Sequence, residues 1–128
     1  MVKVVEWLRI GFESEGIDTS VGKPPEFDSL GYDLIVIGSS IYGGKAVDEI
    51  LEFVQVRNEE LCTKKIATYL VCKTTNCPEV LMEQILDRLN TKPVSQMFIE
   101  GYMFREKNFR SQEGKTQNWI KEIIQKIG

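Results

Sequence analysis

The sequence predicts a three-layer α/β domain with a mostly parallel sheet. Residues 34–37 and 66–72 are nearly unbroken apolar runs, the pattern of strands that are covered on both faces, as in parallel sheets. Stretches with helical apolar periodicity lie between and after these runs. Strands that alternate with helices form a parallel sheet with helices on both faces. The chain shows no internal repeat and no long linker, so residues 1–128 are expected to form a single domain.

The first quarter of the chain predicts one helix and one strand. Residues 3–12 have helical apolar periodicity, and Gly16 suits the left-handed residue that often ends a helix. Residues 17–21 alternate apolar and polar side chains, which indicates a half-exposed strand at a sheet edge. Residues 22–30 contain two consecutive prolines and are expected to be a connection.

The middle of the chain predicts two buried strands, each followed by a loop. The strand at residues 34–37 leads into a loop of small residues that ends at Gly44, and residues 47–54 have the apolar stripe of a helix that packs on a sheet. The strand at residues 66–72 leads into a polar loop at residues 73–77. These two loops follow consecutive predicted strands, and a loop just past such a strand is where open α/β sheets bind ligands.

The last third predicts two helices and a weaker strand. A helix is expected from Pro78 to Leu89, with Leu81, Met82, Ile85 and Leu86 also on its buried side. Residues 96–102 are the weaker strand, residues 104–115 a charged connection, and residues 116–127 a closing helix. Trp7 and Trp119 lie at helical spacings and are expected to pack in the core.

Composition excludes several classes of protein. The formal charge of −3 lacks the basic excess of a nucleic-acid surface, and no apolar run approaches the length of a membrane-spanning helix. Cys62, Cys72 and Cys77 are odd in number and lack CxxC spacing, so reduced cysteines, no zinc site and a cytoplasmic location are expected. There is no histidine. We therefore assign no catalytic residue and no metal ligand, and hydrolase mechanisms have little support.

One stretch resembles a known family. Residues 32–45 read Tyr-Asp-Leu-Ile-Val-Ile-Gly-Ser-Ser-Ile-Tyr-Gly-Gly-Lys, and they resemble the third strand and following loop of the flavodoxin-like proteins. The similarity is closest to the short-chain branch that includes the menaquinone-dependent protoporphyrinogen dehydrogenases. The resemblance implies a flavodoxin-like fold, FMN as cofactor, and electron transfer or quinone-linked oxidoreduction with a redox partner protein or a quinone.

The resemblance also implies which residues contact the flavin. The first flavin loop would consist of Ser39, Ser40, Ile41, Tyr42, Gly43 and Gly44. The second would consist of Lys73, Thr74, Thr75 and Asn76. Small residues let backbone amides approach the ring, and Tyr42 offers an aromatic face for stacking. Lys73 would stabilise a reduced anionic flavin. Residues 104–110 mix aromatic and basic side chains; they are expected to be solvated, with contact to a quinone, a porphyrin or a partner as the alternative.

The N-terminus departs from the family pattern. Flavodoxin-like proteins open with a hydrophobic strand and a phosphate loop of the type T/S-x-T-G-x-T, whereas here the first predicted element is already the helix at residues 3–12. We therefore expect a domain that is N-terminally truncated relative to the family, without its usual first strand. Without the phosphate loop, FMN should bind poorly, because backbone amides at a helix N-terminus are what favour the phosphate.

Several alternatives remain open for this gap. The strand at residues 17–21 could move into it, a second chain could pair at the exposed sheet edge to give a homodimer, or the coding sequence could start further upstream. The alternative to a flavoprotein is a flavodoxin-fold remnant that binds no flavin and serves as an interaction or assembly module.

Overall fold

The computed structural model describes residues 2–22, 32–42, 45–72, 79–89, 91–100 and 106–127. The elements are α1 (Val2–Ser14), β1 (Leu34–Tyr42), β2 (Lys45–Ala46), α2 (Asp48–Val56), α3 (Asn58–Leu61), β3 (Lys65–Cys72), the 3₁₀ helix η1 (Glu79–Met82), α4 (Glu83–Leu86), β4 (Ser95–Glu100) and α5 (Glu106–Ile127). Helices therefore alternate with strands, as predicted.

The described strands form one sheet in the order β2-β1-β3-β4. β1 and β3 are parallel and in register from the pair Leu34–Lys65 to the pair Ile41–Cys72. β4 is parallel to β3, and its last paired residue, Glu100, lies opposite Cys72. β2 is antiparallel and pairs only with the last two residues of β1. We call the end of the sheet at which β1, β3 and β4 terminate its carboxyl end.

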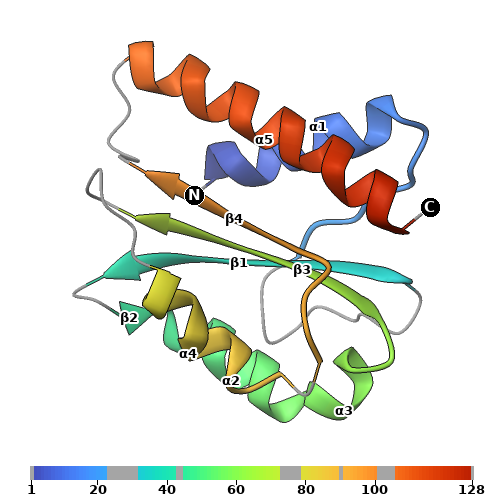
Figure 1. Ribbon diagram of the computed structural model, residues 1–128, viewed down its shortest axis with the longest axis vertical. Helices are drawn as coiled ribbons and strands as arrows, with labels where there is room; N and C mark the ends of the chain where they lie inside the picture. Colours follow the sequence, from blue (N-terminus) through green and yellow to red (C-terminus); the bar gives the residue numbers. More distant parts are fainter. Residues whose placement is uncertain are drawn as a thin grey trace.

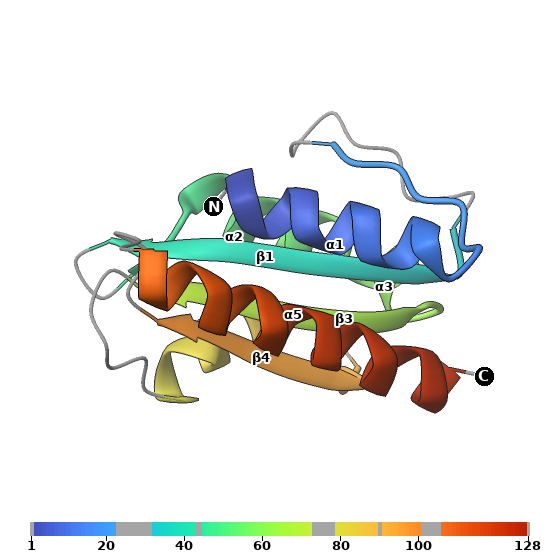
Figure 2. The ribbon, with the colours of Figure 1, turned by 90° about the horizontal axis from the view of Figure 1, so that it is seen from above.

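Helices cover both faces of the sheet and make the three layers that the sequence predicts. Figure 1 shows α1 and α5 on one face, and α2, α3 and α4 on the other. From above, α1 runs alongside β1 and α5 crosses β3 and β4 (Figure 2). The three-layer α/β architecture with a mostly parallel sheet is thus confirmed.

The strand β3 shows why the core has two halves. Its alternate side chains point to opposite faces of the sheet: Ile66, Leu70 and Cys72 pack with α2, α3 and α4, while Ala67, Tyr69 and Val71 pack with α1 and α5. All residues of β3 except Lys65 are buried, which explains the continuous apolar run in the sequence. Trp7 and Trp119 lie in the second half of the core, as predicted.

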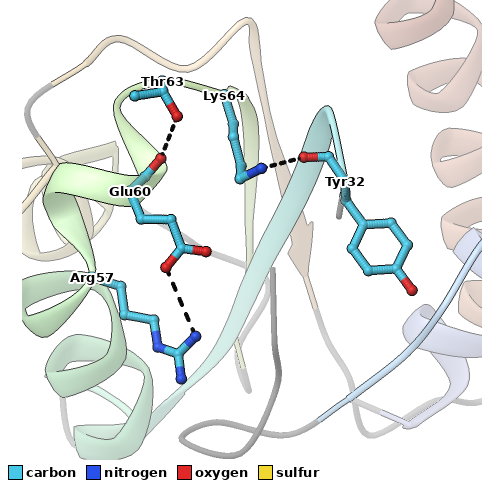
Figure 3. A network of polar contacts seen from close by, with 5 residues as sticks. All are labelled: Tyr32, Arg57, Glu60, Thr63 and Lys64. Carbon is cyan, nitrogen blue, oxygen red and sulfur yellow. Dashed lines mark hydrogen bonds and ion pairs between the residues drawn. The ribbon is translucent and has the colours of Figure 1, made fainter. Parts of the chain in front are cut away.

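A set of polar contacts fixes the amino-terminal ends of β1 and β3 (Figure 3). The Lys64 ammonium donates to the Tyr32 carbonyl at 2.6 Å. The Arg57 guanidinium and the Glu60 carboxylate lie 3.9 Å apart, and the Thr63 hydroxyl donates to the Glu60 carbonyl at 2.7 Å. The Lys64 contact joins the segment before β3 to the segment before β1, and the other two contacts are local to α3.

The predicted edge strand at residues 17–21 is wrong, because residues 17–22 carry no strand. The end of α1 controls this segment instead. Gly16 has the predicted left-handed conformation, with φ 78°, and the Ile17 amide donates back to the Phe12 carbonyl at 3.0 Å. The Ile17 side chain then packs against the core beside α1. Apart from Gly22, the predicted connection at residues 22–30 lies outside the described residues.

Two predictions near the C-terminus also need correction. Residues 106–115 belong to α5 and are not a connection. The polar half of α5 lacks apolar periodicity, and the helix propagates from the half that packs on the sheet, which contains Trp119, Ile120 and Ile123. The helix expected from Pro78 to Leu89 is a 3₁₀ turn followed by one short α-helix, although Met82, Ile85 and Leu89 are buried as predicted. The predicted strand at residues 96–102 is confirmed over its described part, which ends at Glu100.

Candidate functional site

The carboxyl ends of β1 and β3 lie side by side, and the two predicted flavin segments include or follow these ends in the chain. Ile41 of β1 lies directly opposite Cys72 of β3 in the parallel register. The segments that follow these residues in the chain therefore start from neighbouring positions. Open α/β sheets bind ligands outside the carboxyl ends of their strands. This pairing is the geometry that a site between the two segments requires.

The first predicted loop is in large part a strand. Ser39, Ser40, Ile41 and Tyr42 are the last four residues of β1, whereas the sequence predicted the strand to end at Ile37. Ser39 and Ser40 pair with Leu70 and Val71 of β3. The ladder along a buried neighbouring strand therefore outweighs the weak strand preference of serine. Gly43 and Gly44 lie outside the described residues.

The Ser39 side chain is committed to the protein interior. The residue is fully buried, its hydroxyl donates to the Ser40 carbonyl at 2.9 Å, and it accepts from the Val47 amide at 2.9 Å. Val47 immediately precedes α2. Ser39 thus joins the end of β1 to the start of α2, a structural role that the sequence did not indicate. Ser40 and Ile41 are also buried, with 5% and 7% exposure, so contact of these three side chains with a ligand stays a prediction.

A short hairpin follows β1. Tyr42 pairs with Lys45 and Ile41 with Ala46, and the Ala46 amide donates to the Gln84 side-chain oxygen at 2.8 Å. Gln84 of α4 therefore holds β2 in place. No sequence pattern indicates this contact, because a partly exposed glutamine on a short helix has no distinguishing spacing.

Cys72 is disulfide-bonded and only 3% exposed. The predicted burial is confirmed, but the prediction of reduced cysteines is wrong for this residue. Cys62 is free and exposed, so the remaining cysteine of the sequence is Cys77, which lies outside the described residues. The odd cysteine count and the missing CxxC spacing were misleading, because a disulfide requires neither an even count nor this spacing. The other residues of the second predicted loop, Lys73, Thr74, Thr75 and Asn76, also lie outside the described residues.

Gly38 belongs to the packing of the sheet. A Cβ atom at this position would lie 1.9 Å from the ring of Tyr69 on the neighbouring strand. Tyr69 is 2% exposed, and its ring meets that of Trp119 edge-on, with centroids 6.1 Å apart. Desolvation by burial raises the pKa of the Tyr69 phenol well above its ordinary value. The small residue at position 38 therefore makes room for this buried ring.

In an FMN site of this fold, the phosphate group would lie at the N-terminus of α1. The N-terminus of α1 lies toward the carboxyl end of the sheet in both views (Figures 1 and 2), and the first turn of the helix carries no acidic residue. Free amides at a helix N-terminus favour an anion. The N-terminus of α1 is therefore a position at which an anion would be favoured, while contact of the ring-side residues with FMN stays a prediction.

Other features of the described residues do not define a second site. One groove of about 240 Å³ lies between α1 and α5 and is lined by Trp7, Ile10, Gly11 and Lys121 among others; another lies beside Leu86 and Pro93. Neither is at the carboxyl end. Within the described ranges, no group of three or more acidic, cysteine or histidine side chains could hold a metal ion, and no described helix is long and apolar enough to cross a membrane.

Comparison with known proteins agrees with this architecture. The three layers and the parallel strands define an open, doubly wound α/β protein. A family model described as "Flavodoxin domain" matches residues 2–107, which is most of the chain, and the chain therefore belongs to the flavodoxin domain family. The solved structure of a flavodoxin from the domain Archaea superposes with a TM-score of 0.54 at 14% identity, covering 94% of this chain and 87% of that one. At this identity the likeness shows the fold alone. No curated protein sequence matches the chain.

Proposed function

We propose that this chain is a flavodoxin-like domain that takes FMN at the carboxyl end of its sheet and works in electron transfer or quinone-linked oxidoreduction. The observation that carries the proposal is the pairing of Ile41 with Cys72. The segments from Tyr42 to Gly44 and from Lys73 to Asn76 end or follow these two adjacent parallel strands in the chain, which supports a site between them. Membership of the flavodoxin domain family supports FMN as the ligand.

The proposed assignment gives each part of the site a role. Tyr42, Gly43 and Gly44 would contact one side of the flavin, and residues 73–76 the other, with Lys73 stabilising a negative charge on the reduced ring. The phosphate would rely on the N-terminal amides of α1. Bound FMN would supply the redox chemistry, while the protein supplies binding and tunes the potential.

The finer parts of the proposal rest on resemblance. These parts are membership of the branch that includes the menaquinone-dependent protoporphyrinogen dehydrogenases, a redox partner protein or a quinone as the second substrate, a single domain over residues 1–128, and a cytoplasmic location. One premise of the cytoplasmic location, reduced cysteines, does not hold for Cys72.

Titration with FMN tests the main proposal. We expect the purified protein to quench the fluorescence of added FMN and to perturb its visible spectrum. The Tyr42→Ala variant should bind FMN at least several-fold more weakly, because it loses the aromatic stacking face. Tyr32→Ala is the matched control, since Tyr32 lies at the opposite end of β1 and its hydroxyl contacts Ser20. Unchanged FMN fluorescence at high protein concentration would exclude FMN as the ligand of this chain.

A second candidate function is that of a flavin-free interaction or assembly module. One observation favours it: among the described residues, β1 is paired along its length by β3, but on its other side only Ile41 and Tyr42 are paired. An open strand edge of this kind is a template for another strand. A homodimer formed through this edge would show twice the chain mass in light scattering, and its mass would fall on dilution. A mass of one chain at all concentrations would contradict the dimer.

A further inference from the structure

We infer that the free edge of β1 takes one extended, largely apolar strand from another polypeptide, which adds to the sheet beside β1. The inference rests on the second candidate function, that of an interaction module, and names the kind of partner. Its first ground is the pairing of β1. On one side β3 pairs with it from Leu34 to Ile41, whereas on the other side only Ile41 and Tyr42 are paired among the described strands.

The backbone groups at this edge point away from β3. The Lys65 amide donates to the Asp33 carbonyl at 3.0 Å, so the Asp33 carbonyl faces β3. Along a strand, the N–H and C=O groups of successive residues point to opposite sides. The N–H and C=O groups of Leu34, Val36 and Gly38 therefore face the unpaired side of β1. They recur at every second residue, a spacing that the backbone of another extended strand matches.

The side chains along the edge determine what kind of strand fits. Ile35 and Ile37 lie in the half of the core that contains α2, and they are 6% and 4% exposed. Leu34 and Val36 pack against the half with α1 and α5, and they are only partly buried. An added strand would lie between the same two helical layers, so its side chains should be apolar on both faces. It would also cover the apolar surface that Leu34 and Val36 leave exposed.

The edge carries none of the usual protections against another strand. Native edge strands are commonly blunted by charged residues, prolines or bulges. Residues 34–40 read Leu-Ile-Val-Ile-Gly-Ser-Ser, without a charge or a proline, and they pair with β3 one to one, without a bulge. The sequence of β1 is therefore that of an interior strand, which has neighbours on both sides.

The segment at residues 17–22 favours a single strand over a second copy of the sheet. It lies on the side of β1 that faces away from β3 (Figures 1 and 2), and the Tyr32 hydroxyl donates to the Ser20 hydroxyl at 2.6 Å. A whole second sheet would have to displace this segment, whereas a single strand brings no sheet behind it. Residues 17–21 have the alternating pattern of a strand but carry none. An added strand would give them a neighbour to pair with.

Hydrogen exchange followed by NMR tests the edge and its occupant. The probe is an acetylated and amidated peptide with the sequence of residues 64–71, because this segment contains the part of β3 that already pairs with β1. In the protein alone, the amides of Val36 and Gly38 should exchange at least about ten-fold faster than those of Ile35 and Ile37, which face β3. An excess of the peptide should slow the exchange of Val36 and Gly38 by a similar factor.

The control is the same peptide with Ala67→Pro and Thr68→Pro. It lacks backbone donors on both of its sides and should slow neither amide. Three results would overturn the inference. They are equal exchange of the Val36 and Ile37 amides in the protein alone, unchanged exchange with the probe peptide, and slow exchange of Val36 without peptide at twice the chain mass, which would make a second copy the occupant.

The Val36→Lys variant tests the same edge from the side of the protein. A lysine at a free edge opposes the approach of another apolar strand, so the probe peptide should bind at least about ten-fold more weakly. Val56→Lys is the matched control, since Val56 is 74% exposed at the end of α2, and it should bind the peptide as the wild type does. Equal binding by the two variants would overturn the inference. If circular dichroism shows that Val36→Lys does not fold, the exchange experiment on the wild type decides.

Failure of this inference can be told apart from failure of the proposed functions. None of these measurements contains FMN, so they do not depend on the flavoprotein proposal. A dimer whose Val36 and Gly38 amides still exchange rapidly, with and without the peptide, would keep the assembly function and overturn the inference.

Discussion

At the scale of single residues, Gly38 shows that a small side chain can be required by packing inside a sheet. The sequence placed Gly38 among the small residues of a ligand loop. In the structure it lies in β1, opposite Tyr69, and a Cβ atom would come within 1.9 Å of the Tyr69 ring. The ring cannot move aside easily, because Tyr69 is buried and in contact with Trp119.

Gly38→Ala should therefore lower the free energy of unfolding by about 3 kcal/mol, the upper part of the range for overpacked cores. Urea unfolding followed by circular dichroism measures this. Gly114→Ala is the matched control: nothing lies within 4 Å of its Cβ position in α5, so the change should raise stability by about 0.5–1 kcal/mol. Equal stability of Gly38→Ala and the wild type would show that the Tyr69 ring does not occupy this space.

Tyr69 also predicts how stability depends on pH. Its pKa is raised in the folded state by desolvation, while in the unfolded chain it lies near the ordinary value of about 10. Above pH 10 the unfolded state therefore loses a proton that the folded state retains, and stability falls as pH rises. Below pH 10 the residue contributes no pH dependence.

The Tyr69→Phe variant isolates this effect. It should show a smaller loss of unfolding free energy than the wild type between pH 9 and pH 11, measured by urea unfolding at each pH. The other ionisable groups are shared by both proteins and cancel in the difference. Identical pH profiles would mean that the Tyr69 phenol titrates equally in both states.

At the scale of secondary structure elements, α5 is fixed to β4 by a buried polar contact. The Trp119 indole donates to the Ser95 hydroxyl at 2.7 Å, and that hydroxyl donates to the Glu122 carboxylate. Ser95 is the first residue of β4. The contact therefore sets the position of the helix along the strand.

Ser95→Ala should cost about 1–3 kcal/mol of unfolding free energy, because it leaves the buried indole N–H without an acceptor. Chemical denaturation is again the measurement. Glu122→Gln serves as the control, since the amide oxygen still accepts from Ser95 and Glu122 is exposed; its effect should be under about 1 kcal/mol. A larger loss in Glu122→Gln than in Ser95→Ala would reverse the assigned importance of the two contacts.

Some secondary structure elements were predicted correctly from the sequence and others were not. The buried strands β1 and β3 and the packed half of α5 were predicted because long apolar runs and helical stripes report burial directly. The polar half of α5, the two-residue strand β2 and the coil at residues 17–22 were missed. Their conformations depend on neighbours, such as the helix that continues into residues 106–115 or the Gln84 side chain that accepts from Ala46.

At the scale of the whole molecule, the pairing of β1 and the position of the α1 N-terminus bear on the two candidate functions. Over residues 34–40, β1 has a partner on one side only among the described strands. The N-terminus of α1 lies near the carboxyl end of the same sheet (Figure 2). The open strand edge favours an assembly module, and the position of the α1 N-terminus favours FMN binding. FMN titration and the measurement of the mass in solution therefore distinguish a flavoprotein from an assembly module.

The sequence by itself indicated the family through the motif at residues 32–45. It also determined the three layers and the buried strands, because apolar periodicity is a local property of the chain that reflects burial. Only the tertiary structure decided that Ser39 to Tyr42 continue a strand, that Gly38 accommodates Tyr69, and that Cys72 is bonded. Each of these depends on contacts that exist only in the folded chain. Contacts of this kind arise when the sheet is assembled, and no local pattern of residues encodes them.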